Sequence, residues 1–90
     1  MEKVNVDQQD KYGDTPLYNA ASSGHEAVVK LLLATGKVDV NQHNGFGTTP
    51  LIAAARRDFK EVVDLLLNTG KVNVNIQDLN GRTALSMAAQ

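Results

Sequence analysis

Apolar residues cluster at helical spacing in this chain and are separated by polar segments that contain glycine. The valines and leucines between residues 26 and 34 cover more than one face of a helix, which predicts a helix buried on both sides. The same pattern returns 34 residues later, between residues 60 and 68. We expect these two helices to supply most of the core, through Val28, Val29, Leu31, Leu32, Leu33, Val62, Val63, Leu65, Leu66 and Leu67.

A shorter segment rich in small residues precedes each of these helices. Thr15 can cap a helix, and Pro16 suits the first turn because an N–H there has no intrahelical partner. Gly24 ends this first helix, and Gly36 closes the second with the residue that a left-handed cap prefers. A third copy of the first segment begins near Thr83, so we expect two full helix pairs and one terminal helix.

The chain is an internal repeat. Residues 3–36 and 37–70 agree at 17 of 34 positions, and residues 71–90 agree with 37–56 at nine of 20. A period of this length predicts an all-α repeat solenoid, whose units bury their core against their neighbours. Valines that alternate with polar residues, followed by Gly47 or Gly81, predict hairpin-like fingers near 3–13, 37–47 and 71–81, without a continuous sheet.

These residues resemble a known family. The first repeat contains Asp10-x-x-Gly13-x-Thr15-Pro16-Leu17-x-x-Ala20-Ala21-x-x-Gly24-His25-x-x-Val28-Val29-x-Leu31-Leu32-Leu33-x-x-Gly36. This pattern is similar to that of an ankyrin repeat, which implies an L-shaped stack of helix pairs with fingers along one edge. We divide the chain, a single domain over 1–90, into an arm at 1–9, repeats at 10–43 and 44–77, and a partial repeat at 78–90.

Three departures from the family pattern change the expectations. The histidine that usually follows Thr-Pro-Leu is replaced by Tyr18, Ile52 and Ser86, so its hydrogen bonds must be replaced or lost. Asp58-Phe59 replaces Gly-His in the second repeat, which puts the usual turn in question and predicts an aromatic ring at the repeat interface. The 34-residue period predicts a slightly longer loop after the second helix.

The third repeat stops at Gln90, after its first helix, and Met1-Glu2 aligns with the end of a preceding second helix. We interpret the chain as a segment of a longer array, with a naturally short protein as the alternative. Leu85 and the small face around Ala88-Ala89 would then lack a covering helix, so we expect marginal stability and self-association through this end.

Composition narrows the classes of partner. The 90 residues carry a net charge of −1 with a pI near 6.0, which disfavours nucleic acid and anionic membranes as partners. Cysteine is absent, and no apolar run approaches the length of a membrane span or of a secretory signal. We therefore expect an intracellular protein, either cytoplasmic or nuclear.

The candidate catalytic groups are better explained as structural residues. His25 is expected to begin the second helix, and His43 lies in a loop without a partner at ligand spacing. Asp10, Asn44 and Asp78 recur every 34 residues, as side-chain oxygens that organise a turn would. We assign no catalytic, cofactor-binding or metal-binding residue and expect a protein that is not an enzyme.

The resemblance implies that a protein partner would bind the finger tips and the exposed side of the first helices. Tyr12 and Phe46 hold equivalent finger positions, where they either anchor a partner or pack against the neighbouring finger. Arg56 and Arg57 could pair with acidic groups or simply remain solvated. The predicted binding residues are Lys11, Tyr12, Asp14, Ser22, Ser23, Phe46, Thr48, Arg56, Arg57, Leu79, Asn80 and Arg82.

The main functional hypothesis is a protein-binding module that presents a concave face of fingers and first helices. One alternative is a regulatory or targeting segment of a larger multidomain enzyme, which would use the same surface. A second alternative is a passive or designed scaffold, although the repeats differ at the expected contact positions. The partner remains unidentified because a fold does not determine what it binds.

Overall fold

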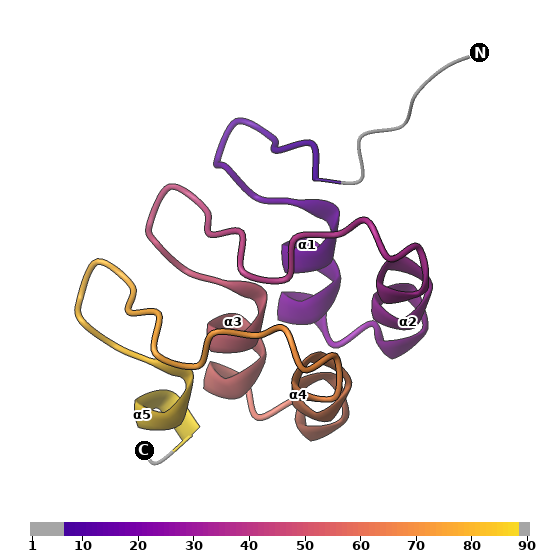
Figure 1. Cartoon of the computed structure of the whole chain (residues 1–90). Coiled ribbons are helices and arrows are strands. Elements are labelled where there is room, and N and C mark those ends of the chain that lie inside the picture. Colours follow the sequence, from indigo (N-terminus) through magenta and orange to yellow (C-terminus); the bar gives the residue numbers. More distant parts are fainter. Residues whose placement is uncertain (1–6, 89–90) are drawn as a thin grey trace.

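The computed structural model describes residues 7–88, without the side chain of Ala88. Part of the first predicted finger, as well as Ala89 and Gln90, therefore lies outside the described residues. Figure 1 shows two columns of helices, with the first helices of the repeats in one column and the second helices in the other. The elements are α1 (Pro16–Ser23), α2 (Glu26–Ala34), α3 (Pro50–Arg56), α4 (Lys60–Leu67) and α5 (Ala84–Ala88).

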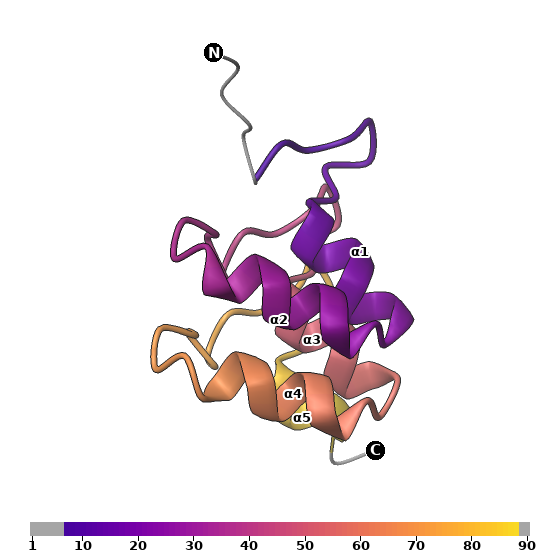
Figure 2. The ribbon, with the colours of Figure 1, turned by 90° about the vertical axis from the view of Figure 1, so that its right-hand side faces the viewer.

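The all-α repeat solenoid is confirmed, and residues 7–88 contain no β-strand. Along the first column α1 packs on α3 and α3 packs on α5, while α2 packs on α4 in the second column. Figure 2 shows the second column from the side, with α2 above α4. Each repeat is therefore stabilised mainly by the repeats next to it.

The predicted helix starts and ends are present. The Thr15 Oγ1 accepts a hydrogen bond from the N–H of Tyr18 at 3.1 Å, and α3 begins with the equivalent bond from Ile52 to Thr49 at 3.2 Å. Gly24 ends α1 with φ 73°, in the left-handed region that favours glycine. In these two helices a threonine supplies the capping oxygen, whatever residue replaces the family histidine.

The second repeat keeps the turn between its helices although its glycine is replaced by Asp58. Asp58 adopts φ 62°, close to the 73° of Gly24, a conformation that costs a residue with a side chain roughly 1–2 kcal/mol. The next residues, His25 and Phe59, also share one backbone conformation. The Phe59 ring lies against Gly24, 3.2 Å from where a Cβ would stand. The predicted aromatic at the repeat interface is confirmed.

The core lies between the two columns, and much of it comes from the first helices. Leu17, Ile52 and four alanines of α1 and α3 are buried, together with Val29, Val62 and Leu66 of the second helices. Small residues at these positions let neighbouring first helices approach closely. The prediction that α2 and α4 would supply most of the core is therefore wrong, because the first helices supply much of it.

Three of the ten predicted core residues are exposed: Val28 at 43%, Leu31 at 70% and Leu67 at 43%. The reason is that a second helix has two packing faces, one toward each neighbouring repeat. Val28 and Leu31 face the side of α2 on which residues 7–88 place no other helix. Their equivalents in α4, Val62 and Leu65, are buried or half-buried because α2 packs on α4.

Candidate protein-binding surface

The fingers are shaped by one repeated side-chain turn. In each finger a single oxygen accepts hydrogen bonds from the N–H groups two and four residues later, at 2.9–3.0 Å. A short polar side chain can replace backbone hydrogen bonds in this way. The predicted turn role is confirmed for the three acceptors, which are the Oδ1 atoms of Asp10, Asn44 and Asp78.

Direct backbone hydrogen bonds fix successive fingers to each other. The N–H of Gly45 donates to the Tyr12 carbonyl at 3.0 Å, and the N–H of Leu79 donates to the Phe46 carbonyl at 3.1 Å. Gly13 adopts φ 81°, and a Cβ on it would lie 2.8 Å from the Gly45 nitrogen. A side chain at that position would therefore separate the first two fingers.

The finger tips present large apolar side chains to solvent. Tyr12 is 58% exposed, Phe46 66% and Leu79 76%. The Lys11 ammonium lies 5.2 Å from the centroid of the Tyr12 ring, within the range of a cation–π contact. Both rings are therefore accessible to a partner at the finger tips.

The other predicted contact residues differ in accessibility. Thr48 is only 4% exposed, and its N–H donates to the Asn44 side chain, so its side chain is not available to a partner. This prediction is corrected: position 48 supports the turn instead of facing outward. Half-buried residues are Asp14, Ser22 and Arg82; exposed residues are Lys11, Ser23, Arg56, Arg57 and Asn80.

Comparison with known proteins decides the family. A family model described as an ankyrin repeat matches residues 12–45, and a model of three ankyrin repeats matches residues 34–90. The chain belongs to the ankyrin repeat family. An ankyrin repeat-containing protein of Saccharomyces cerevisiae is 58% identical over 33 residues, which cover 37% of this chain and 6% of that protein.

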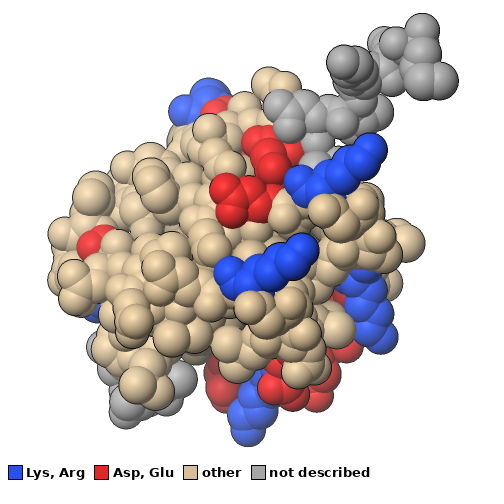
Figure 3. Space-filling model, viewed as in Figure 1, with Lys and Arg blue, Asp and Glu red and all other residues tan. Residues whose placement is uncertain are grey.

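Ankyrin repeats generally serve as protein–protein interaction modules. The chain spans 6% of the length of the curated relative that it matches, so that relative's activity is not transferred to this ankyrin stack. Figure 3 shows the face toward the viewer of Figure 1, where the finger side is mostly uncharged and charged side chains gather toward the second column and the lower edge. The sparse charge on this view of the finger side is compatible with apolar contacts to a partner.

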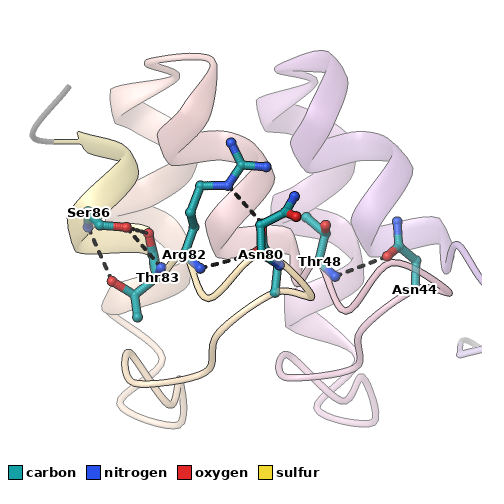
Figure 4. A network of polar contacts seen from close by, with 7 residues as sticks. Asn44, Thr48, Asn80, Arg82, Thr83 and Ser86 are labelled. Carbon is teal, nitrogen blue, oxygen red and sulfur yellow. Dashed lines mark hydrogen bonds and ion pairs between the residues drawn. The ribbon is translucent and has the colours of Figure 1, made fainter.

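The third ankyrin finger differs from the second in carrying an ion pair. The Arg82 Nε lies 3.4 Å from the Asp78 Oδ2. In the second finger the equivalent positions hold the uncharged residues Asn44 and Thr48, which Figure 4 shows. The hydrogen bond from the backbone N–H of Arg82 lowers the pKa of Asp78, against the opposing effect of burial; the N–H of Asn80 and the Arg82 charge also lower it. Asp78 is therefore ionised at neutral pH.

The start of α5 shows how one lost family histidine is replaced. The Ser86 Oγ accepts the N–H of Thr83 at 2.9 Å and donates to the Thr83 carbonyl at 2.9 Å, as Figure 4 shows. The Thr83 Oγ1 accepts the N–H of Ser86 at 3.2 Å. These bonds satisfy backbone groups that the start of a helix otherwise leaves unpaired.

The histidines and carboxylates form no site of their own in the described part of the ankyrin chain. His25 is exposed at the N-cap of α2 and makes no capping hydrogen bond through its side chain. His43 is exposed, with its Nδ1 2.9 Å from the Asn44 carbonyl. Between residues 7 and 88 no three His, Asp or Glu residues gather as metal ligands, and no helix is long and apolar enough to cross a membrane.

Only part of a groove at the C-terminal end of the ankyrin stack was predicted from the sequence. The prediction identified Leu85, which is exposed, but assigned Val63 and Leu67 to the core and Val74 to an extended arm. All four residues line the same groove, of about 660 Å³. The repeat itself could have predicted the groove. One repeat earlier, the equivalent residues pack against a second helix, and that helix has no copy within residues 7–88.

Proposed function

We propose that this ankyrin stack binds a protein partner through the finger surface, with the three finger tips as its anchors. The other residues of this surface contribute polar and charged contacts around those anchors. We define the finger surface as Lys11, Tyr12, Asp14, Ser22, Ser23, Phe46, Arg56, Arg57, Leu79, Asn80 and Arg82.

The observation that carries this proposal is the row of exposed apolar side chains at three successive tips, namely Tyr12, Phe46 and Leu79. Their backbones are already joined by hydrogen bonds from finger to finger, so binding would order few groups. A large aromatic side chain can bury roughly 150–250 Å², and such residues often dominate the binding energy of an interface. The tips therefore supply a preformed apolar row.

The charges of the finger surface indicate the chemistry of the partner. Lys11, Arg56 and Arg57 are exposed basic residues, whereas Asp14 is half-buried and accepts a hydrogen bond from the Asn44 side chain. Arg82 is already paired with Asp78. We infer a partner that places an apolar segment across the tips and acidic groups near these three basic side chains.

Affinity capture from a cell extract tests the proposal with three forms of the chain. The first is the native chain, the second carries Tyr12→Ala, Phe46→Ala and Leu79→Ala, and the control carries Leu31→Ala. Leu31 is 70% exposed on α2, away from the fingers, so the control removes a similar exposed apolar side chain. We expect a protein that the native and control chains capture and that the triple variant binds at least about tenfold more weakly.

Thermal unfolding accompanies the capture experiment. All three chains should unfold at similar temperatures, since the substituted side chains are mostly exposed. Identical captured proteins from the native chain and the triple variant would contradict binding through the finger tips, and the capture of no protein by any of the three chains would favour a passive scaffold. A large stability loss in the triple variant alone, with binding per folded molecule intact, would make the tips structural.

A further inference from the structure

Two asparagines of the fingers are directly followed by glycine, namely Asn44 before Gly45 and Asn80 before Gly81. In such a pair the backbone nitrogen of the glycine can attack the side-chain Cγ of the asparagine. Glycine favours this step because it has no Cβ to hinder the approach and its backbone is unusually free. Both pairs are therefore chemically competent for spontaneous deamidation, and their surroundings in the fold decide which of them reacts.

The reaction needs only water as a co-reactant. A bond forms between the glycine nitrogen and Cγ, and the side-chain amide leaves as ammonia with the proton of that nitrogen, which closes a succinimide ring. Water then opens the ring. Cleavage of the new N–Cγ bond gives aspartate, whereas cleavage of the original peptide bond gives isoaspartate, whose main chain runs through the former side chain. Either product replaces a neutral amide with a carboxylate that is ionised at neutral pH.

The side chain of Asn44 is held by the turn that it organises. Asn44 is only 6% exposed. Its Oδ1 accepts the N–H groups of Phe46 at 2.9 Å and Thr48 at 3.0 Å, and Figure 4 shows the bond to Thr48. Its Nδ2 donates to the Asp14 carboxylate at 3.0 Å. Ring closure would break these hydrogen bonds and leave backbone groups of the turn unpaired.

The attacking nitrogen of this first pair is held as well. The N–H of Gly45 donates to the Tyr12 carbonyl at 3.0 Å, which is one of the bonds that join successive fingers. The place of a Cβ on Gly13 lies only 2.8 Å from the Gly45 nitrogen, so the first finger packs closely on this atom. Deamidation of Asn44 therefore requires a local opening that separates the first two fingers, and the population of that opened state limits its rate.

Asn80 has neither restraint. It is exposed, and its side chain makes no hydrogen bond within residues 7–88. Its own N–H donates to the Asp78 Oδ1 at 2.9 Å, and the N–H of Gly81 donates to the Asp78 carbonyl at 2.9 Å. The bond of the attacking nitrogen thus lies within one finger. The succinimide ring can form here without separating two fingers or uncovering a buried side chain.

The exposure of Asn80 belongs to its position in the repeat. The equivalent residues in the first two fingers, Tyr12 and Phe46, are 58% and 66% exposed. Each of these two fingers has a further finger bonded to it, yet the side chain at this position stays accessible. A further finger beside the third would therefore leave Asn80 exposed as well.

We propose that Asn80 is a deamidation site in the folded chain, that Asn44 is protected, and that the third finger tip thereby gains a carboxylate with time. The effect on binding rests on the proposed function. The first two fingers carry an aromatic anchor at this position, and in the third it lies next to Leu79. A carboxylate here disfavours the apolar segment of the partner and repels its acidic groups. Deamidation therefore weakens binding by the finger surface irreversibly.

Peptide mass spectrometry follows both asparagines in the full 90-residue chain. Exchange of the amide nitrogen for oxygen raises the mass of each peptide, and chromatography separates the aspartate and isoaspartate products. One sample stays folded, and a second is unfolded in guanidinium chloride at the same pH and temperature. We expect Asn80 to react at least about tenfold faster than Asn44 in the folded chain, and the two rates to agree within about threefold in the unfolded chain.

Two variants test why Asn44 is protected. Gly13→Ala places a Cβ against the Gly45 nitrogen and should open the contact between the first two fingers, so deamidation of Asn44 should become at least about threefold faster. Asp14→Ala is the milder variant, because it removes only the acceptor of the Asn44 Nδ2, and it should act in the same direction. The rate at Asn80 should stay unchanged in both, and circular dichroism confirms that the variants are folded.

Several results would overturn the deamidation site. Equal rates at the two asparagines of the folded chain, or a faster reaction at Asn44, contradict it directly. A difference of the same size in the unfolded chain would assign the selectivity to the neighbouring residues in the sequence instead of to the fold. Unchanged rates at Asn44 in both folded variants would overturn its protection by the first finger.

The capture experiment described above tests the effect on binding, with Asn80→Asp in place of the deamidated residue. The matched control is Asn68→Asp, which makes the same change at an exposed residue at the end of α4, away from the fingers. We expect Asn80→Asp to bind the captured protein at least about threefold more weakly than the native chain, and the control to bind it equally well.

The outcomes separate this effect from the proposed function. If the triple variant of the tips loses the captured protein while Asn80→Asp keeps its full affinity, the effect of the carboxylate is overturned and the finger surface stands. If the triple variant also keeps the protein, the finger surface and the effect on it fail together. Deamidation of Asn80 itself is decided by the mass spectrometry alone.

Discussion

The two second helices have nearly the same apolar pattern and different surroundings. Val29 of α2 is buried under the following repeat, while its equivalent in α4, Val63, is half-buried beside an open groove. Conversely, Val62 of α4 is buried under α2, while its equivalent, Val28, is exposed. Whether a residue of a stack is buried therefore depends on the neighbouring repeat as much as on the residue itself.

The largest expected difference is between an inner and an outer leucine of these helices. Leu66 is fully buried in α4, and Leu66→Ala should lower the free energy of unfolding by about 2–5 kcal/mol, through lost burial and a cavity. Leu31→Ala should cost under about 1 kcal/mol because that side chain is already mostly exposed. Urea unfolding of both variants measures the difference, and equal costs would refute the two-face account of the second helices.

Local signals in the sequence predicted much of the fold. Thr15, Pro16 and Gly24 mark the limits of α1, because caps depend on residues within a few positions of each other. Asp10, Asn44 and Asp78 predicted the finger turns for the same reason. These interactions span four residues or fewer, so the chain contains all the information that they need.

The signals failed where the outcome depends on contacts between repeats. The apolar pattern of α2 indicates two packing faces but not whether both are covered, so Val28 and Leu31 were wrongly assigned to the core. Thr48 was placed on the binding surface because the family resemblance implies contacts at the finger tips, yet its side chain is only 4% exposed. Asp58 keeps a positive φ that its residue type alone disfavours.

Filling the groove should have the next largest effect. A copy of residues 57–70 appended after Gln90 would supply a second helix in the correct register, and it should cover Leu67, Val74 and Leu85. We expect the free energy of unfolding to rise by about 1–3 kcal/mol from this burial. We also predict that the 90-residue chain associates at high concentration, and the extension should decrease this association.

Sedimentation and thermal unfolding at several concentrations check this expectation. The matched control is the same extension with aspartates at the copies of Val62 and Leu66, the two buried residues of α4. This control adds the same length without an apolar face, so it should leave stability unchanged. If the 90-residue chain is monomeric throughout and both extensions stabilise it equally, exposure of the groove has no energetic consequence.

The smallest expected effect distinguishes the second finger from the third. Asn44 and Asp78 organise the same turn, but only Asp78 can titrate, and its pKa is lowered by the N–H of Arg82 and further by the N–H of Asn80 and the Arg82 charge. A carboxyl whose pKa is lower in the folded chain stabilises the folded state at pH values above its ordinary pKa near 3.9. This contribution is lost as the pH falls through the folded pKa.

Asp78→Asn keeps the accepting oxygen, as Asn44 does, and removes the charge. We expect urea unfolding to show a loss of under about 1 kcal/mol at pH 7 that begins to shrink below about pH 4 and vanishes below the folded pKa. An equal loss at pH 7 and pH 3 would mean that the substitution disturbs the turn itself, because a charge effect must vanish when the native carboxyl is protonated.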